Sequence, residues 1–171
     1  FDSFNYITTD NRYRLPGGAA VGNVLHTLFE KFPFDYIYDC DTFTTFKAQY
    51  ADHSLFDDTL QLYKIDLLFK NDVLLILWHT LKGTCPDPVD DKMAIAIGGI
   101  TQRQHEQGFT FTYGKNGVIF PSKEVIGYIV GFIDMVFKHN ERYYILDWKS
   151  DTLENYEHKT MKQSMYQRNY D

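Results

Sequence analysis

Three charged side chains in the last third of the chain have types and spacing that suit phosphodiester chemistry. Asp134 lies within an apolar run, and Asp147 and Lys149 close a second one, residues 143–146. Successive side chains of a strand point to opposite faces, so Asp147 and Lys149 would share a face. Hard cations such as Mg²⁺ take carboxylate oxygens, and an ammonium can steady negative charge that develops on a phosphate. The three residues therefore predict metal-assisted hydrolysis of a phosphodiester.

A tight turn between the two runs would bring the aspartates together. If residues 140–141 form this turn, His139 opposes Arg142 and, counting on, Asp134 opposes Asp147. Directly opposed side chains have Cβ atoms about 4.5–5.5 Å apart, where like charges destabilise a sheet unless a cation lies between them. A divalent metal would resolve that conflict. The alternative is that both aspartates are strand-end charges facing solvent, with Lys149 paired to one of them.

The pattern of an acid two residues before a lysine is weak by itself. It occurs three times, at residues 90–92, 147–149 and 157–159. Only the second example closes an apolar strand, and only it has an earlier strand with a carboxylate in register. This context separates Asp147 and Lys149 from the other two matches.

The elements that must position these residues follow from the spacing of apolar side chains. Apolar residues at i, i+3, i+4 and i+7 from Ala19 to Phe32 predict an amphipathic helix, which begins after Gly18 and ends at Pro33. A second apolar zone, residues 55–81, predicts two helices with a break near Asn71. Alternating or β-branched and aromatic segments predict three strands, and a polar tail predicts a last helix. These strands are expected at residues 108–113, 125–137 and 142–149, and the helix at 153–171.

This order of elements predicts an α/β or α+β fold. A helical N-terminal half precedes a central sheet that contains a β-meander hairpin and is flanked by helices. The chain has 171 residues, 44% of them hydrophobic, which suits a single folded domain over residues 1–171. Its abundant Tyr and Phe residues are expected mostly to fill the core and the strands.

Charge, cysteine content and hydropathy exclude several classes of protein. The net charge of −6 argues against a polybasic protein held to nucleic acid by bulk charge. Cys40 and Cys85 have no partners at the spacing of a zinc site or of a disulfide framework, so a reducing cytoplasm is expected. The longest apolar run, residues 73–78, is far below the roughly 20 residues that span a bilayer, so no membrane partner is expected.

Two blocks of the sequence resemble the C-terminal nuclease domain of the RecB subunit of exodeoxyribonuclease V. One block joins Gly131–Phe137 to Arg142–Ser150, and the other joins Leu15–Gly18 to Val21–Glu30. The resemblance implies a restriction-endonuclease-like fold of the PD-(D/E)XK class, with a mixed sheet flanked by helices. It also implies a Mg²⁺-dependent DNA exonuclease and endonuclease, in which Mn²⁺ can substitute, acting in double-strand-break repair and recombination.

The resemblance also implies a set of site residues. These are the metal ligands His26, Asp134, Asp147 and the backbone carbonyl of Trp148, the catalytic residues Asp134, Asp147 and Lys149, and the acidic neighbour Glu106. On a helical wheel His26 lies about 60° from Phe29, on the margin of the apolar stripe, from which it could reach a sheet edge. The alternative is that His26 binds no metal and lies either in the core or at the polar margin of the helix.

The family further implies partners for the chain. These are DNA and RecC-like and RecD-like subunits of a helicase-nuclease complex. No GxxxxGK[ST] loop is present, so an ATP site is expected outside this sequence. The family's next helix carries Gln and Tyr at i and i+4, and this sequence lacks that pair, so we expect an excised domain that stops before that helix. The alternative function is a catalytically inactive nuclease-like scaffold or DNA-path module in the same complex.

Overall fold

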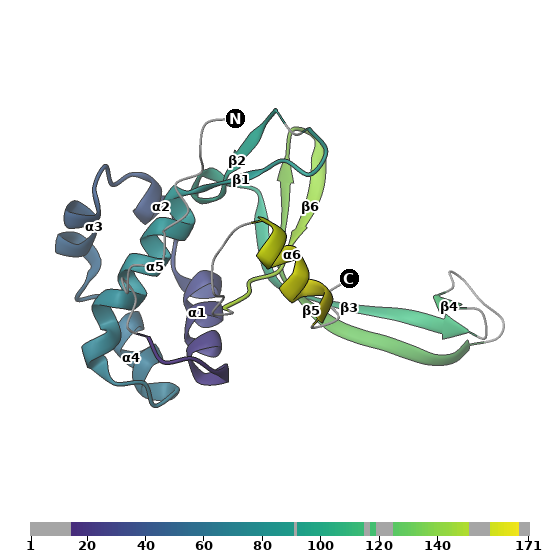
Figure 1. Ribbon diagram of the computed structural model, residues 1–171, viewed down its shortest axis with the longest axis horizontal. Helices are drawn as coiled ribbons and strands as arrows, with labels where there is room; N and C mark the ends of the chain where they lie inside the picture. The colour runs from purple at the N-terminus through teal and green to yellow at the C-terminus, as the bar shows by residue number, and fades with distance from the viewer. Residues whose placement is uncertain (1–14, 91, 115–116, 119–124, 151–157, 168–171) are drawn as a thin grey trace.

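The computed structural model has a mixed α/β fold and describes residues 15–90, 92–114, 117–118, 125–150 and 158–167. Its helices are α1 (Ala19–Lys31), α2 (Phe34–Tyr38), α3 (Phe43–Tyr50), α4 (Ser54–Leu62), α5 (Lys70–Lys82) and α6 (His158–Gln167), with 3₁₀ turns at Leu67–Phe69 and Ile97–Gly99. Its strands are β1 (Thr84–Pro86), β2 (Ala94–Ala96), β3 (Arg103–Gly114), β4 (Gly117–Val118), β5 (Val125–His139) and β6 (Arg142–Leu146). Helices α1–α5 gather at one end of the molecule and the larger sheet lies beside them (Figure 1).

Helix α1 confirms the first predicted helix. It begins after Gly18, whose φ of 115° is a backbone conformation that glycine adopts without strain. It ends before Pro33, which lacks the N–H that would continue the helix. Val24 and Leu28 are fully buried in a core shared with the other helices of this end of the molecule. Among the described residues, none of the helices combines the length and the apolar character needed to cross a membrane.

The remaining helices differ from the prediction in two ways. Helices α2 and α3 were not expected; α3 starts where the Thr42 side chain accepts a hydrogen bond from the Thr45 N–H at 3.1 Å. The break between the two later helices falls around Lys64, which has a φ of 57°, and not near Asn71, which lies inside α5. A positive φ cannot continue a right-handed helix, so the chain turns there.

The larger sheet has four strands in the order β4-β3-β5-β6, and β1 pairs separately with β2. Every pairing among the described strands is antiparallel, so the predicted mixed sheet is wrong for this part of the chain. For β5 and β6 the physical reason is their short connection, because parallel neighbours need a crossover of a dozen residues or more. Strand β6 also ends earlier than predicted, at Leu146, so Asp147 and Lys149 follow the strand.

The register of the β5–β6 hairpin agrees with the prediction. His139 pairs with Arg142, and Asn140 and Glu141 between them have φ values of 47° and 60°. Positive φ at both central residues gives a turn whose twist matches that of the strands. This local geometry fixes the pairing along β6 up to Leu146, which pairs with Met135, the neighbour of Asp134.

Strands β3 and β5 continue past the helices as a long two-stranded arm (Figure 1). At the helical end, β5 contributes the buried Met135 and Phe137 to the core. On the arm the aromatic side chains are exposed, with 67% for Tyr128 and 71% for Phe132, as is Tyr143 of β6. These three lie in strands, as expected, but they are not part of the core, and no described helix buries them.

Candidate metal centre

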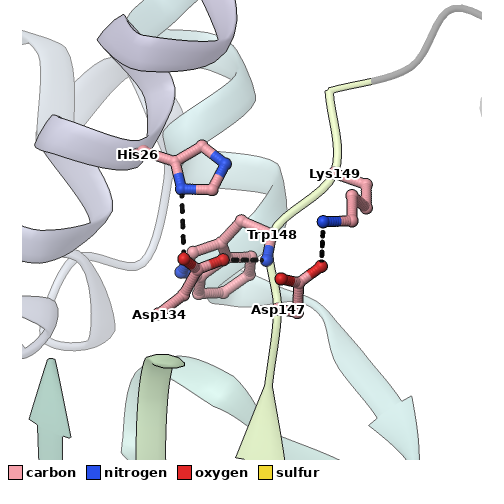
Figure 2. A network of polar contacts seen from close by, with 5 residues as sticks. All are labelled: His26, Asp134, Asp147, Trp148 and Lys149. Carbon is pink, nitrogen blue, oxygen red and sulfur yellow. Dashed lines mark hydrogen bonds and ion pairs between the residues drawn. The ribbon is translucent and has the colours of Figure 1, made fainter. Parts of the chain in front are cut away.

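Helix α1 brings His26 to the edge of the larger sheet. His26 Nδ1 lies 3.4 Å from Asp134 Oδ1, and the side chains are 33% and 14% exposed. Figure 2 shows the imidazole facing the carboxylate across the gap between the helix and β5. The pair joins residues more than a hundred positions apart, which the packing of α1 beside β5 brings together.

A second carboxylate reaches the same place from β3. Glu106 lies between the paired positions His105–Met135 and Gln107–Ile133, so it stands opposite Asp134. One ligand atom from each of His26, Glu106 and Asp134 lies within 4.8 Å of the other two. The carboxylate that stands across from Asp134 is therefore Glu106 of β3, whereas the sequence led us to expect Asp147 in that position.

Asp147 lies outside this group of three. The β5–β6 ladder ends at the pair Met135–Leu146, one position before Asp134 and Asp147 could pair. Asp134 Oδ2 instead accepts a hydrogen bond from the Trp148 N–H at 2.6 Å. Asp147 forms an ion pair with Lys149, and Figure 2 shows both side chains on the segment that follows β6. The structure thus brings all the sequence-predicted site residues to one region, with Asp147 paired to Lys149.

The donor atoms of this group suit a divalent cation. At a metal–ligand distance of about 2.1 Å, two ligands of one ion lie about 3 Å apart at a right angle and about 4.2 Å apart when opposite. The separations of 3.4 Å and at most 4.8 Å need only a small contraction to reach these values. Carboxylates suit Mg²⁺ and Mn²⁺, whereas imidazole is typical of transition metals. His26, Glu106 and Asp134 therefore fit either ion, with the imidazole favouring Mn²⁺.

Strand β6 is anchored on its core side by a buried hydrogen bond. Tyr144 stacks on Phe137 with ring centroids 5.1 Å apart, and its hydroxyl donates to Asp87 Oδ2 at 3.0 Å. The Val89 N–H donates to Asp87 Oδ1 at 2.8 Å. The pKa of Asp87 is lowered, and the largest cause is the hydrogen bond from the Val89 N–H, which stabilises the carboxylate. The Tyr144 hydroxyl lowers the pKa further, whereas burial acts to raise it. This contact fixes the strand that leads into the Asp147 segment.

Two RecB subunits are similar to this chain. The chain is 26% identical to "RecBCD enzyme subunit RecB" of Haemophilus influenzae over 92% of its length, and 27% identical to the subunit of the same name from Buchnera aphidicola subsp. Schizaphis graminum over 93%. It spans 14% of the length of each relative. No family model matches the chain.

The sequence did not reveal the role of the Trp148 ring. Only its backbone carbonyl was expected in the site, as a metal ligand, and that expectation stays a prediction. The ring stacks on Phe29 of α1, with centroids 4.2 Å apart and an interplanar angle of 18°. Phe29 follows His26 by three residues, so the two lie on neighbouring parts of one helix face. That spacing was the available signal, but only the structure identifies the aromatic partner.

Proposed function

We propose that this chain is a divalent-metal-dependent DNA nuclease domain of a RecB-like subunit. The single observation that carries the proposal is the convergence of His26, Glu106 and Asp134, from three separate elements, beside the segment that holds Lys149. Similarity to two RecB subunits supports DNA as the substrate and a multisubunit repair enzyme as the setting. RecC-like and RecD-like partner subunits belong to this proposal.

The chemistry proposed is hydrolysis of a phosphodiester bond. When bound by His26, Glu106 and Asp134, a divalent ion would polarise the phosphate and lower the pKa of a water molecule. The N–H of Trp148 holds one oxygen of Asp134 and leaves the other directed toward His26. Asp147 holds the Lys149 ammonium close to the group, where it can neutralise charge that develops on the phosphate. The role of Asp147 as a metal ligand, implied by the resemblance, remains part of the proposal.

A cleavage assay tests this function directly. The purified chain is incubated with end-labelled linear DNA, single- and double-stranded, in MnCl₂ or MgCl₂, with EDTA as the negative control. We expect metal-dependent cleavage that falls by about 100-fold in Asp134→Asn and in Lys149→Gln. Asp58→Asn is the matched control, because Asp58 is an exposed acid on α4, in the helical end of the molecule. Equal cleavage by wild type and Asp134→Asn would refute the proposal.

One observation favours a second candidate, a nuclease-like scaffold without catalytic activity. The carboxylate of Asp147 is paired with Lys149 and lies outside the group of three ligands. A scaffold of this kind would bind Mn²⁺ but would not cut either form of DNA at any metal concentration. Measurement of metal binding beside cleavage separates the two candidates.

A further inference from the structure

One face of α1 meets the chain segment that follows β6 at more than one point. Gly22, His26 and Phe29 are spaced at i, i+4 and i+7, so they share a face of the helix. Phe29 stacks on the Trp148 ring. A Cβ atom at Gly22 would lie 3.0 Å from Ser150 Oγ, which is tighter than most contacts of real Cβ atoms. The helix that presents His26 therefore also determines where residues 148–150 lie.

Trp148 is attached to the site by two different parts of the residue. Its backbone N–H donates to Asp134 Oδ2 at 2.6 Å, and its ring lies against Phe29, which is 4% exposed. The residue stands between Asp147 and Lys149 in the sequence, so a displacement of Trp148 displaces both neighbours. The two attachments connect β5, the Asp147–Lys149 segment and α1, and Figure 2 shows the first of them, from the Trp148 N–H to Asp134.

The polar atom of the Trp148 ring takes no part in this connection. Within the described part of the chain, Trp148 Nε1 is buried and has no hydrogen-bond partner. A buried donor without a partner destabilises the folded state. The ring is therefore held by its apolar faces, and a phenylalanine at this position would keep the stack while removing the unpaired donor.

We propose that Trp148 is a positioning residue of the candidate metal centre. Its ring, seated on Phe29, keeps the Asp147–Lys149 segment against α1, and its N–H keeps Asp134 directed toward His26. Groups that orient metal ligands commonly change metal affinity by 10- to 100-fold when they are lost. This inference rests on the proposed function, because it assigns Trp148 to the same metal centre.

The test measures Mn²⁺ affinity with MnCl₂ as the probe, from the electron paramagnetic resonance signal of the free ion. We expect Trp148→Ala to bind Mn²⁺ about 10-fold more weakly than wild type, and Trp148→Phe to stay within about twofold. Tyr36→Ala is the matched control, since Tyr36 and Tyr50 form a similar stack within the helical end, with centroids 4.8 Å apart. Its Mn²⁺ affinity should equal that of wild type.

A second variant covers the case in which Trp148→Ala does not fold. Phe29→Leu removes the partner ring but keeps a large apolar side chain, and it should weaken Mn²⁺ binding in the same direction as Trp148→Ala. In the double variant the two losses should not add, because both remove one stack. Unchanged Mn²⁺ affinity in folded Trp148→Ala or in Phe29→Leu would overturn the proposal.

A measurement without metal separates this inference from the proposed function. The Trp148 N–H donates a hydrogen bond to Asp134, so the rate of hydrogen exchange at this amide in metal-free protein reports how firmly the Asp147–Lys149 segment is held. We expect faster exchange at this amide in Phe29→Leu and no change in Tyr36→Ala. If wild type binds no Mn²⁺, the proposed function fails. If exchange at the Trp148 amide is equal in wild type and Phe29→Leu, the positioning role fails.

Discussion

Thermal unfolding with and without Mn²⁺ tests whether Asp134 is a metal ligand. His26, Glu106 and Asp134 come from α1, β3 and β5, so the group exists only in the folded chain, and a bound ion adds RT ln(1 + [L]/Kd) to the free energy of unfolding. At a metal concentration 100 times Kd this is about 2.7 kcal/mol. For a chain of this size, 1 kcal/mol shifts Tm by about 2–4 °C, so wild type should gain about 5–11 °C.

Asp134→Asn should remove most of this gain. The amide has no charge and is a weaker ligand, but its oxygen can still accept the hydrogen bond from the Trp148 N–H. The substitution also relieves repulsion between Asp134 and Glu106, so Tm without metal should stay within about 2 °C of wild type or rise. The assay is differential scanning fluorimetry over a MnCl₂ series, with Asp58→Asn as the control. A gain in Asp134→Asn as large as in wild type would show that the ion binds elsewhere, and the geometric reasoning would be wrong.

Two further predictions concern the other acidic residues. Glu106 belongs to the candidate ligand group, whereas Asp147 is paired to Lys149. Glu106→Gln should therefore reduce the Mn²⁺-induced Tm shift more than Asp147→Asn, and the reverse order would favour Asp147 as the ligand. The pKa of Asp87 is lowered from its ordinary value of 3.8, first by the Val89 N–H, so this carboxylate stabilises the fold above about pH 3.8. That stability is lost as the pH falls through the lowered pKa. Tyr144→Phe lacks one hydrogen-bond donor to Asp87, so its free energy of unfolding, measured with urea, should fall less between pH 5 and pH 2 than that of wild type.

The hairpin could be predicted from the sequence because its determinants are local. The turn at residues 140–141 sets the register, and the pairing of His139 with Arg142 is confirmed. Alternation then indicates which side chains share a face, without knowledge of the rest of the fold. The same holds for α1, whose apolar spacing and flanking Gly18 and Pro33 are all within one short segment. The register of this hairpin and the bounds of α1 were therefore accessible from neighbouring residues alone.

The rest of the fold depends on contacts that the sequence does not display. Helix α2 has five residues, too few for a periodic pattern, and is held by the burial of Phe34 and Ile37. The exposed aromatic side chains on the arm, Tyr128 and Phe132, alternate along the strand as they would in a half-buried strand. Their composition therefore predicted a face covered by another part of the fold. Which helices cover which part of a sheet is decided by tertiary packing, and in the described residues the helices cover only the end of the sheet near Met135.

Glu106 shows why the composition of the candidate site was harder to predict than its location. Its φ of 49° places a non-glycine residue in the left-handed region, at a position that otherwise continues a strand. Such a backbone conformation destabilises the fold by about 1–3 kcal/mol, and the carboxylate that it presents faces that of Asp134. Strain and like charge at this point both oppose folding, and His26 approaches the same place. A divalent cation would offset the repulsion between the two carboxylates. We therefore expect this arrangement to be more stable with a metal ion bound than without one, and the Mn²⁺-induced Tm shift measures that difference.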